Sequence, residues 1–220
     1  IVGGTGLYLN ALLAGHGFAG GDKDGAYRAE LERRWEEEGG EAMVQELRRI
    51  DPETAGKLHL NDKKRILRAL EVYYETGKTM AQHNAETKLV PPRYDSVRIG
   101  LAYEDREDMK RAIDARVDKM VEAGLFDEVR ALLASGLSRD VTAMQAIGYK
   151  EALSYLDGAA TREEAIAEIK LRSRQYAKRQ LTWLRRDKDI HWYHWEKTRD
   201  LADCLAFSTE ILREYGVSCS

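Results

Sequence analysis

The sequence predicts a mostly helical protein of the α/β class with a few short strands. Apolar residues recur at helical spacing from about residue 25 to residue 84, whereas the runs at 97–103 and 190–195 have strand patterns. A glycine-rich turn between apolar residues opens the chain, as in the strand-to-helix turns of α/β proteins. A helical block at 22–90 therefore lies between segments that are typical of a mixed α/β core.

The composition limits the classes of protein that the chain can represent. With 220 residues, 43% hydrophobic and 33% charged, it is long enough to bury a substantial core. Its net charge of -3 gives no global attraction to nucleic acid, so any such site must be a local patch. No apolar run approaches the ~20 residues of a membrane span. Cys204 and Cys219 fit neither a disulfide framework nor a zinc cluster, and we expect a soluble cytoplasmic protein.

The first stretch, Ile1-Val2-Gly3-Gly4-Thr5-Gly6-Leu7-Tyr8-Leu9, reads as the remnant of a strand, a turn and a helix that extends to residue 14. Thr5 could exchange a hydrogen bond with a ligand, or the turn could simply be a tight connection. The glycines at 15–21 then indicate a flexible crossover.

Helix signals dominate the next block. Asp51 and Pro52 form an N-cap and a first helical residue. After Asn61 and Asp62 a strongly periodic stretch follows, and Gly77 ends it. The sequence Gly77-Lys78-Thr79 resembles the end of a P-loop, but Val72 occupies the position of the first glycine. We therefore interpret Gly77 as a helix C-cap.

Pro91 and Pro92 mark a boundary, and the strand at 97–103 follows them. Helices resume at about Arg106, with apolar stripes that end at Gly124 and Gly136.

A capping box of Thr161 and Glu164 starts a long helix that reaches about Arg186. The alternating run at 190–195 predicts a strand, and a last helix spans roughly 201–214.

Two clusters of basic residues could bind an anion. Lys64, Arg65 and Arg68 share one side of a helix, where they could contact phosphates or form a solvated face.

The longest helix is more informative. It carries eight basic residues against Glu168 and Asp187, an excess of 8 − 2 = +6: Lys170, Arg172, Arg174, Lys178, Arg179, Arg185, Arg186 and Lys188. Lys170, Arg174 and Lys178 predict one basic ribbon, and the aromatic residues Tyr176 and Trp183 lie among the charges. This pattern favours an anionic ligand, most simply RNA, over an ordinary surface.

The residues alone nominate no catalytic centre. His191 and His194 face opposite sides of an alternating strand, and no acid or cysteine nearby completes a ligand set. We therefore predict no metal site in this chain, and the acids show no pair with the spacing of a catalytic dyad.

Five stretches in order resemble the tRNA dimethylallyltransferases, also called tRNA isopentenyltransferases. They are GGTGLYL at 3–9, DPETAGKLHLNDKKRILRALEVYYETGKT at 51–79, RVDKMVEAGLFDEV at 116–129, AMQAIGYKEALSYLDG at 143–158 and RQYAKRQLTWLRR at 174–186. The resemblance covers nearly the whole chain, and the absence of a zinc-finger extension from this sequence suggests a bacterial-type member.

This resemblance implies a P-loop nucleotide-kinase-like core with a helical insertion domain. Residues 1–21 would be a core segment, 22–92 the insertion domain contacting tRNA, and 93–220 the return to the core with the channel and tRNA-binding helices. It also implies transfer of a dimethylallyl group from dimethylallyl diphosphate to N6 of adenosine 37, in tRNAs that read codons beginning with U. The expected partners are the tRNA anticodon stem-loop and the diphosphate donor. Mg²⁺ would come with the substrate, no motif in this chain would bind it, and the protein would be a monomer.

The resemblance assigns roles to individual residues. Thr5 would lie near the target adenine, and Arg116 would meet the diphosphate. The residues expected to contact tRNA are Arg28, Lys64, Arg65, Arg68, Gln145, Gly148, Tyr149, Lys150, Lys178, Arg179, Gln180, Trp183 and Arg185.

The chain also departs from the family pattern. The family P-loop and its catalytic aspartate would belong to an N-terminal part that this sequence lacks, so we expect the chain alone to have no transferase activity. Ala112 stands where many members carry arginine. Two alternatives remain: a non-catalytic RNA-binding module, and a prenyltransferase acting on free adenine nucleotides, against which the extended basic surface argues.

Overall fold

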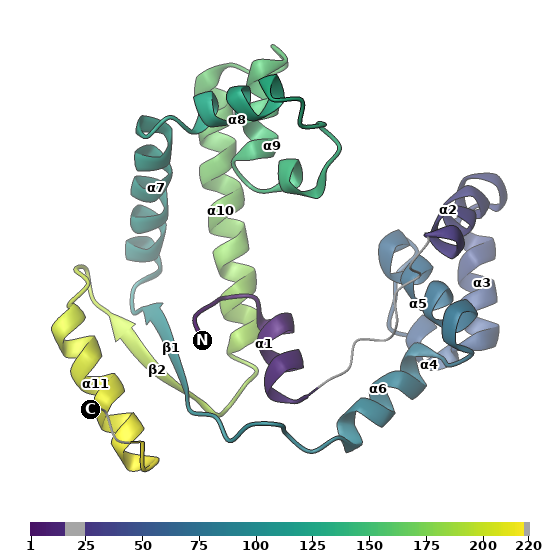
Figure 1. The fold of residues 1–220 in the computed structure, drawn as a ribbon, viewed down its shortest axis with the longest axis horizontal. Helices are drawn as coiled ribbons and strands as arrows, with labels where there is room; N and C mark the ends of the chain where they lie inside the picture. Colours follow the sequence, from purple (N-terminus) through teal and green to yellow (C-terminus); the bar gives the residue numbers. More distant parts are fainter. Residues whose placement is uncertain (16–24, 218–220) are drawn as a thin grey trace. The chain divides into compact units, whose positions relative to one another are not determined.

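The structure, a computed structural model, describes residues 1–15 and 25–217. They separate into two compact units, Ile1–Ser96 and Val97–Ser220, and each has its own cluster of buried apolar side chains. Figure 1 shows the helices and strands of both units as a ribbon. Most of the predicted crossover at 15–21, and the predicted boundary between 21 and 22, fall outside the described residues. The roles predicted for residues 1–21, 22–92 and 93–220, in the core or in contact with tRNA, remain predictions.

Helices form the first unit. They are α1 (Gly6–Leu13), α2 (Ala26–Glu38), α3 (Gly40–Ile50), α4 (Pro52–Ala55), α5 (Lys63–Thr76) and α6 (Met80–Leu89). The core gathers around α5, whose Ile66 and Leu70 are fully buried with Met43 of α3. Each such side chain contributes about 1.5–3 kcal/mol by leaving water.

Caps determine where these helices begin and end. Asp51 accepts a hydrogen bond from the Thr54 backbone N–H at 3.0 Å, which confirms the predicted N-cap of α4. Gly77 has a φ of 70° and ends α5, so its interpretation as a C-cap is confirmed. Thr79 then starts α6 in a capping box with Gln82.

The first residues differ from the prediction. Ile1 and Val2 lie outside any strand in the described structure and are fully exposed. A strand needs a neighbour to satisfy its backbone groups. The one sheet of the described residues consists of β1 (Arg98–Tyr103) and β2 (Ile190–Trp195) of the second unit, without this segment.

The second unit combines a small sheet with helices. Its elements are β1 (Arg98–Tyr103), α7 (Arg106–Glu122), α8 (Leu125–Ala134), the 3₁₀ turn η1 (Thr142–Gln145), α9 (Tyr149–Leu156), α10 (Arg162–Leu184), β2 (Ile190–Trp195) and α11 (Leu201–Glu214). The predicted strands and final helix are confirmed, whereas η1 and α9 were not assigned from the sequence. The long helix ends at Leu184 rather than at Arg186.

The two strands pair in parallel, with Arg98 opposite Ile190 and Tyr103 opposite Trp195. Gly100 makes this pairing possible, because a Cβ there would lie 2.7 Å from both the Trp192 ring and the Ile190 side chain. Figure 1 shows α11 alongside β2, where the rings of Tyr193 and Phe207 lie 5.4 Å apart.

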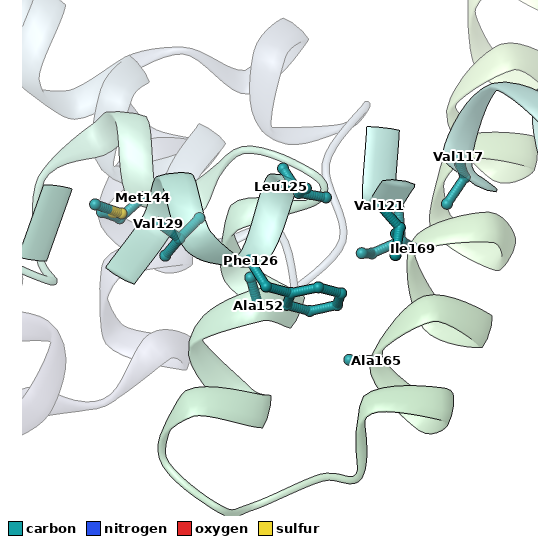
Figure 2. Close-up of a cluster of buried hydrophobic side chains, with 9 residues drawn as sticks. All are labelled: Val117, Val121, Leu125, Phe126, Val129, Met144, Ala152, Ala165 and Ile169. Atoms are coloured by element: carbon teal, nitrogen blue, oxygen red, sulfur yellow. The ribbon is translucent and has the colours of Figure 1, made fainter. Parts of the chain in front are cut away.

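The helical core of this unit fixes the start of α10. Figure 2 shows Ala165 and Ile169 of α10 facing residues of α7 and α8, among them Val121 and Phe126. Because Ala165 and Ile169 are almost completely buried, the first half of the 23-residue helix is anchored by apolar packing.

Candidate nucleic-acid interface

Ion pairs divide the basic helix α10 into two halves. In the first half, Lys170 binds Asp118 at 2.6 Å, and Arg174 binds both carboxylate oxygens of Asp114, at 2.7 and 3.0 Å. Both acids lie on α7, which runs beside α10 (Figure 1). Arg172 pairs with Glu168 of its own helix at 2.6 Å. Of the predicted ribbon of Lys170, Arg174 and Lys178, the first two residues are therefore neutralised by acids of the chain.

The last turns of α10, with Arg185 and Arg186 just after its end, keep their positive charge. Lys178, Arg179, Arg185 and Arg186 are exposed, and among residues 1–15 and 25–217 none of them has a carboxylate within ion-pair distance. Four uncompensated cations within about two turns create a local positive potential in a chain of net charge -3. This is the kind of surface that attracts phosphates.

Aromatic rings lie among these cations. The guanidinium of Arg179 lies 5.8 Å from the ring centroid of Tyr176, and that of Arg186 lies 5.9 Å from the ring of Trp183. Both rings are about two-fifths exposed. Cations and accessible π-faces in one patch suit the binding of single-stranded nucleic acid.

A hollow of about 350 Å³ lies on this surface. It is lined by five residues of α10 and by Arg186, which follows the helix: Gln175, Lys178, Arg179, Thr182, Trp183 and Arg186. Gln175 and Thr182 were not among the residues expected to contact tRNA, whereas Arg186 was predicted as one of the eight basic residues of the long helix. The spacing of Gln175 and Thr182 from Arg179, four and three residues, is the signal that could have found them. Gln180 and Arg185, which were predicted, do not line the hollow.

A second predicted stretch lies around the start of α9. Gln145 and Lys150 are exposed, whereas Gly148 is buried at a φ of 104° that favours glycine. The Gly148 backbone N–H donates to the Glu151 carboxylate at 2.7 Å, which fixes this turn. The Tyr149 hydroxyl donates to Glu128, and this hydrogen bond raises the pKa of Tyr149.

Arg116, the predicted diphosphate contact, is exposed on α7. It follows Asp114 by two residues, so the two side chains leave the helix in nearly opposite directions. The side of α7 that pairs with α10 is therefore nearly opposite the side that carries Arg116, where Arg116 is accessible to a ligand.

The remaining predicted residues belong to the first unit. Thr5 is the exposed N-cap residue of α1, and its side chain makes no capping hydrogen bond. Lys64 and Arg65 are exposed on α5. Arg28 and Arg68 both donate to the buried Glu71, at 3.0 and 2.9 Å. These two arginines therefore have a structural task in addition to the predicted one.

Within 1–15 and 25–217, no three or more His, Cys, Asp or Glu side chains form a group that could hold a metal ion. In the same part of the chain, no helix is long and apolar enough to cross a membrane.

A comparison with models of protein families shows which family this chain belongs to. The model of the family described as IPP transferase matches residues 1–187. The chain belongs to the IPP transferase family. Its matched region includes α10 to beyond its C-terminus, and therefore the whole of the exposed basic surface up to Arg186.

Named relatives in the IPP transferase family agree with this assignment. The tRNA dimethylallyltransferase of Halothermothrix orenii is 45% identical over 194 residues, which cover 88% of this chain and 59% of that protein. That of Carboxydothermus hydrogenoformans is 46% identical over 219 residues, covering 99% and 68%. The chain spans 59%, 64% and 66% of the length of three such relatives.

Solved structures of tRNA isopentenyltransferases are also similar. The full-length tRNA isopentenylpyrophosphate transferase of Bacillus halodurans is 38% identical with a TM-score of 0.58, over 96% of this chain and 66% of that one. A eukaryotic dimethylallyltransferase, whose crystal structures capture it acting on tRNA, is 28% identical with a TM-score of 0.73, over 100% and 57%. This mostly helical chain of the IPP transferase family, with its small parallel sheet, is therefore similar in structure to tRNA isopentenyltransferases, the family that the sequence resembled.

Proposed function

We propose that this chain carries the tRNA-binding surface and part of the catalytic channel of a tRNA dimethylallyltransferase. The reaction would join C1 of the dimethylallyl group to N6 of adenosine 37, with loss of diphosphate and of one N6 proton. Its substrates would be tRNAs that read codons beginning with U. The observation that carries the proposal is the uncompensated basic and aromatic half of α10, in a chain of the IPP transferase family.

Each part of the site has a task in this proposal. Lys178, Arg179 and Arg185 hold the phosphates of the anticodon stem-loop. Arg116 offsets charge on the departing diphosphate, and Thr5, whose hydroxyl makes no capping bond, is available to the target base. The adenine must leave its stack before N6 can react. Mg²⁺ would arrive with the diphosphate, and the P-loop kinase-like core implied by the resemblance would complete the site.

The first test compares two pairs of arginines on the same helix. The salt dependence of binding to an anticodon stem-loop is measured for Arg179→Ala/Arg185→Ala and for the control Arg172→Ala/Arg174→Ala. We expect the slope of log K against log [salt] to fall by about 1–2 in the first variant, since each lost phosphate contact removes about one unit. The control should keep its slope, because both of its arginines are paired with acids of the chain.

Equal loss of slope in both variants would contradict the proposed interface, provided that circular dichroism shows the control to be folded. A stem-loop with position 37 changed from adenosine then tests base recognition. Prenyl transfer to the unchanged stem-loop, which has adenosine at position 37, by a protein that contains the chain would distinguish the enzyme from a non-catalytic RNA-binding module.

A further inference from the structure

The hollow on α10 has the features of a binding site for one small planar group. Its six lining residues recur at spacings of three and four residues, so the five that belong to α10 share one face of the helix and Arg186 follows just beyond its end. Its volume of about 350 Å³ lies at the lower end of the range for small-molecule sites. A site of this size suits a single nucleotide better than a folded partner.

Trp183 provides a large apolar surface in this hollow. It is 42% exposed, whereas Trp35, Trp192 and Trp195 are buried or half-buried. A partly exposed indole loses part of the stabilisation that full burial would give it. Its position between Arg179 and Arg186 indicates a ligand with both a flat apolar face and negative charge.

Polar groups complete the lining. The Thr182 hydroxyl donates to the Lys178 carbonyl at 2.9 Å, so its oxygen can still accept a hydrogen bond. Gln175 offers an amide with donors and an acceptor, which can pair with the edge of a base. No carboxylate lines the hollow, so no fixed negative charge opposes a phosphate there.

We infer that this hollow binds one unpaired RNA nucleobase, which stacks on Trp183 while the adjoining phosphates lie against Lys178, Arg179 and Arg186. This inference deepens the proposed function and rests on it. A paired duplex presents phosphates but no free base face, so it could use the cations and not the indole. The unpaired loop of a stem-loop offers both.

The experiment measures the affinity of the protein for a stem-loop and for a duplex with the same number of phosphates. Trp183→Ala should weaken stem-loop binding about tenfold, because one base–aromatic stack is worth ~1–3 kcal/mol. Duplex binding and the salt slope should stay unchanged. Trp183→Phe, which keeps an aromatic face, should restore most of the affinity. Leu171→Ala is the control, because Leu171 is 40% exposed on the ion-paired half of the same helix.

An abasic substitution at each loop position then identifies the stacked base. At one position the abasic loop should bind about tenfold more weakly to the wild-type protein and no more weakly to Trp183→Ala. Unchanged stem-loop affinity in Trp183→Ala, or an equal loss on the duplex, would overturn the stacking and leave the proposed function standing. If the wild-type protein shows no salt-sensitive RNA binding, both the proposed function and this inference fail.

Discussion

Asp51 is a single carboxylate that two helices share. Its Oδ1 accepts from the Thr54 N–H in α4 and its Oδ2 from the Ala81 N–H in α6, both at 3.0 Å, and the residue is only 3% exposed. Burial disfavours its charged form, but these backbone donors outweigh burial and lower the pKa of Asp51 below its ordinary 3.8.

Asp51→Ala should therefore lower the free energy of unfolding by about 2 kcal/mol near pH 7, since a lost N-cap costs ~0.5–2 kcal/mol and two donors lose their acceptor. Because the pKa is depressed on folding, the carboxylate stabilises fully above 3.8, and this contribution disappears as the pH falls through the lowered value. Urea denaturation of both proteins across this range measures the difference. A difference that is constant with pH would contradict the role of the charge.

The sequence predicted one of the two hydrogen bonds that Asp51 accepts. The contact to Thr54 is three residues away and follows from the Asp-Pro signal, whereas Ala81 is 30 residues away. Arg28 and Arg68 show the same limit, because the ion pair from Arg28 to Glu71 spans 43 residues. Which charges meet inside a unit depends on tertiary packing that helical spacing does not encode.

At the scale of elements, local signals were sufficient to locate most helices and strands. The alternation of β2 and the Asp200 cap of α11 lie within the elements themselves, and their predicted bounds agree with the structure. The division of α10 could not be predicted in this way. Two of its three neutralising acids come from α7, and the separation is 60 residues for Arg174 and Asp114.

The ion pair between α7 and α10 leads to a prediction about the free energy of unfolding. Asp114→Asn and Arg174→Gln, alone and combined, should give a coupling energy of about 0.5–1 kcal/mol, because both side chains are roughly one-third exposed and solvent screens the pair. Thermal and urea unfolding of the four proteins measure it.

The same cycle at Arg179 and Asp114, which form no ion pair with each other, is the control and should give no coupling. Zero coupling at Arg174 as well would mean that the pair of Arg174 and Asp114 contributes nothing to holding the two helices together.

At the scale of the whole chain, we expect RNA binding to occur without prenyl transfer. The 220-residue sequence contains no P-loop, since Val72 occupies the place of the first glycine before Gly77-Lys78-Thr79. We therefore expect this chain to bind an anticodon stem-loop with strong salt dependence and to transfer no prenyl group to it. Incubation with dimethylallyl diphosphate and mass analysis of the RNA tests this expectation, and turnover by the chain alone would contradict it.

The uneven charge of α10 also has a consequence for the speed of encounter. Opposite charges in contact cancel beyond a Debye length of about 8 Å at physiological salt, so a distant RNA is attracted by Lys178 and the cations after it rather than by Lys170 or Arg174. The RNA would then approach already turned toward one end of the helix. Adding salt should slow its arrival more than it hastens its departure, as in other electrostatically steered associations.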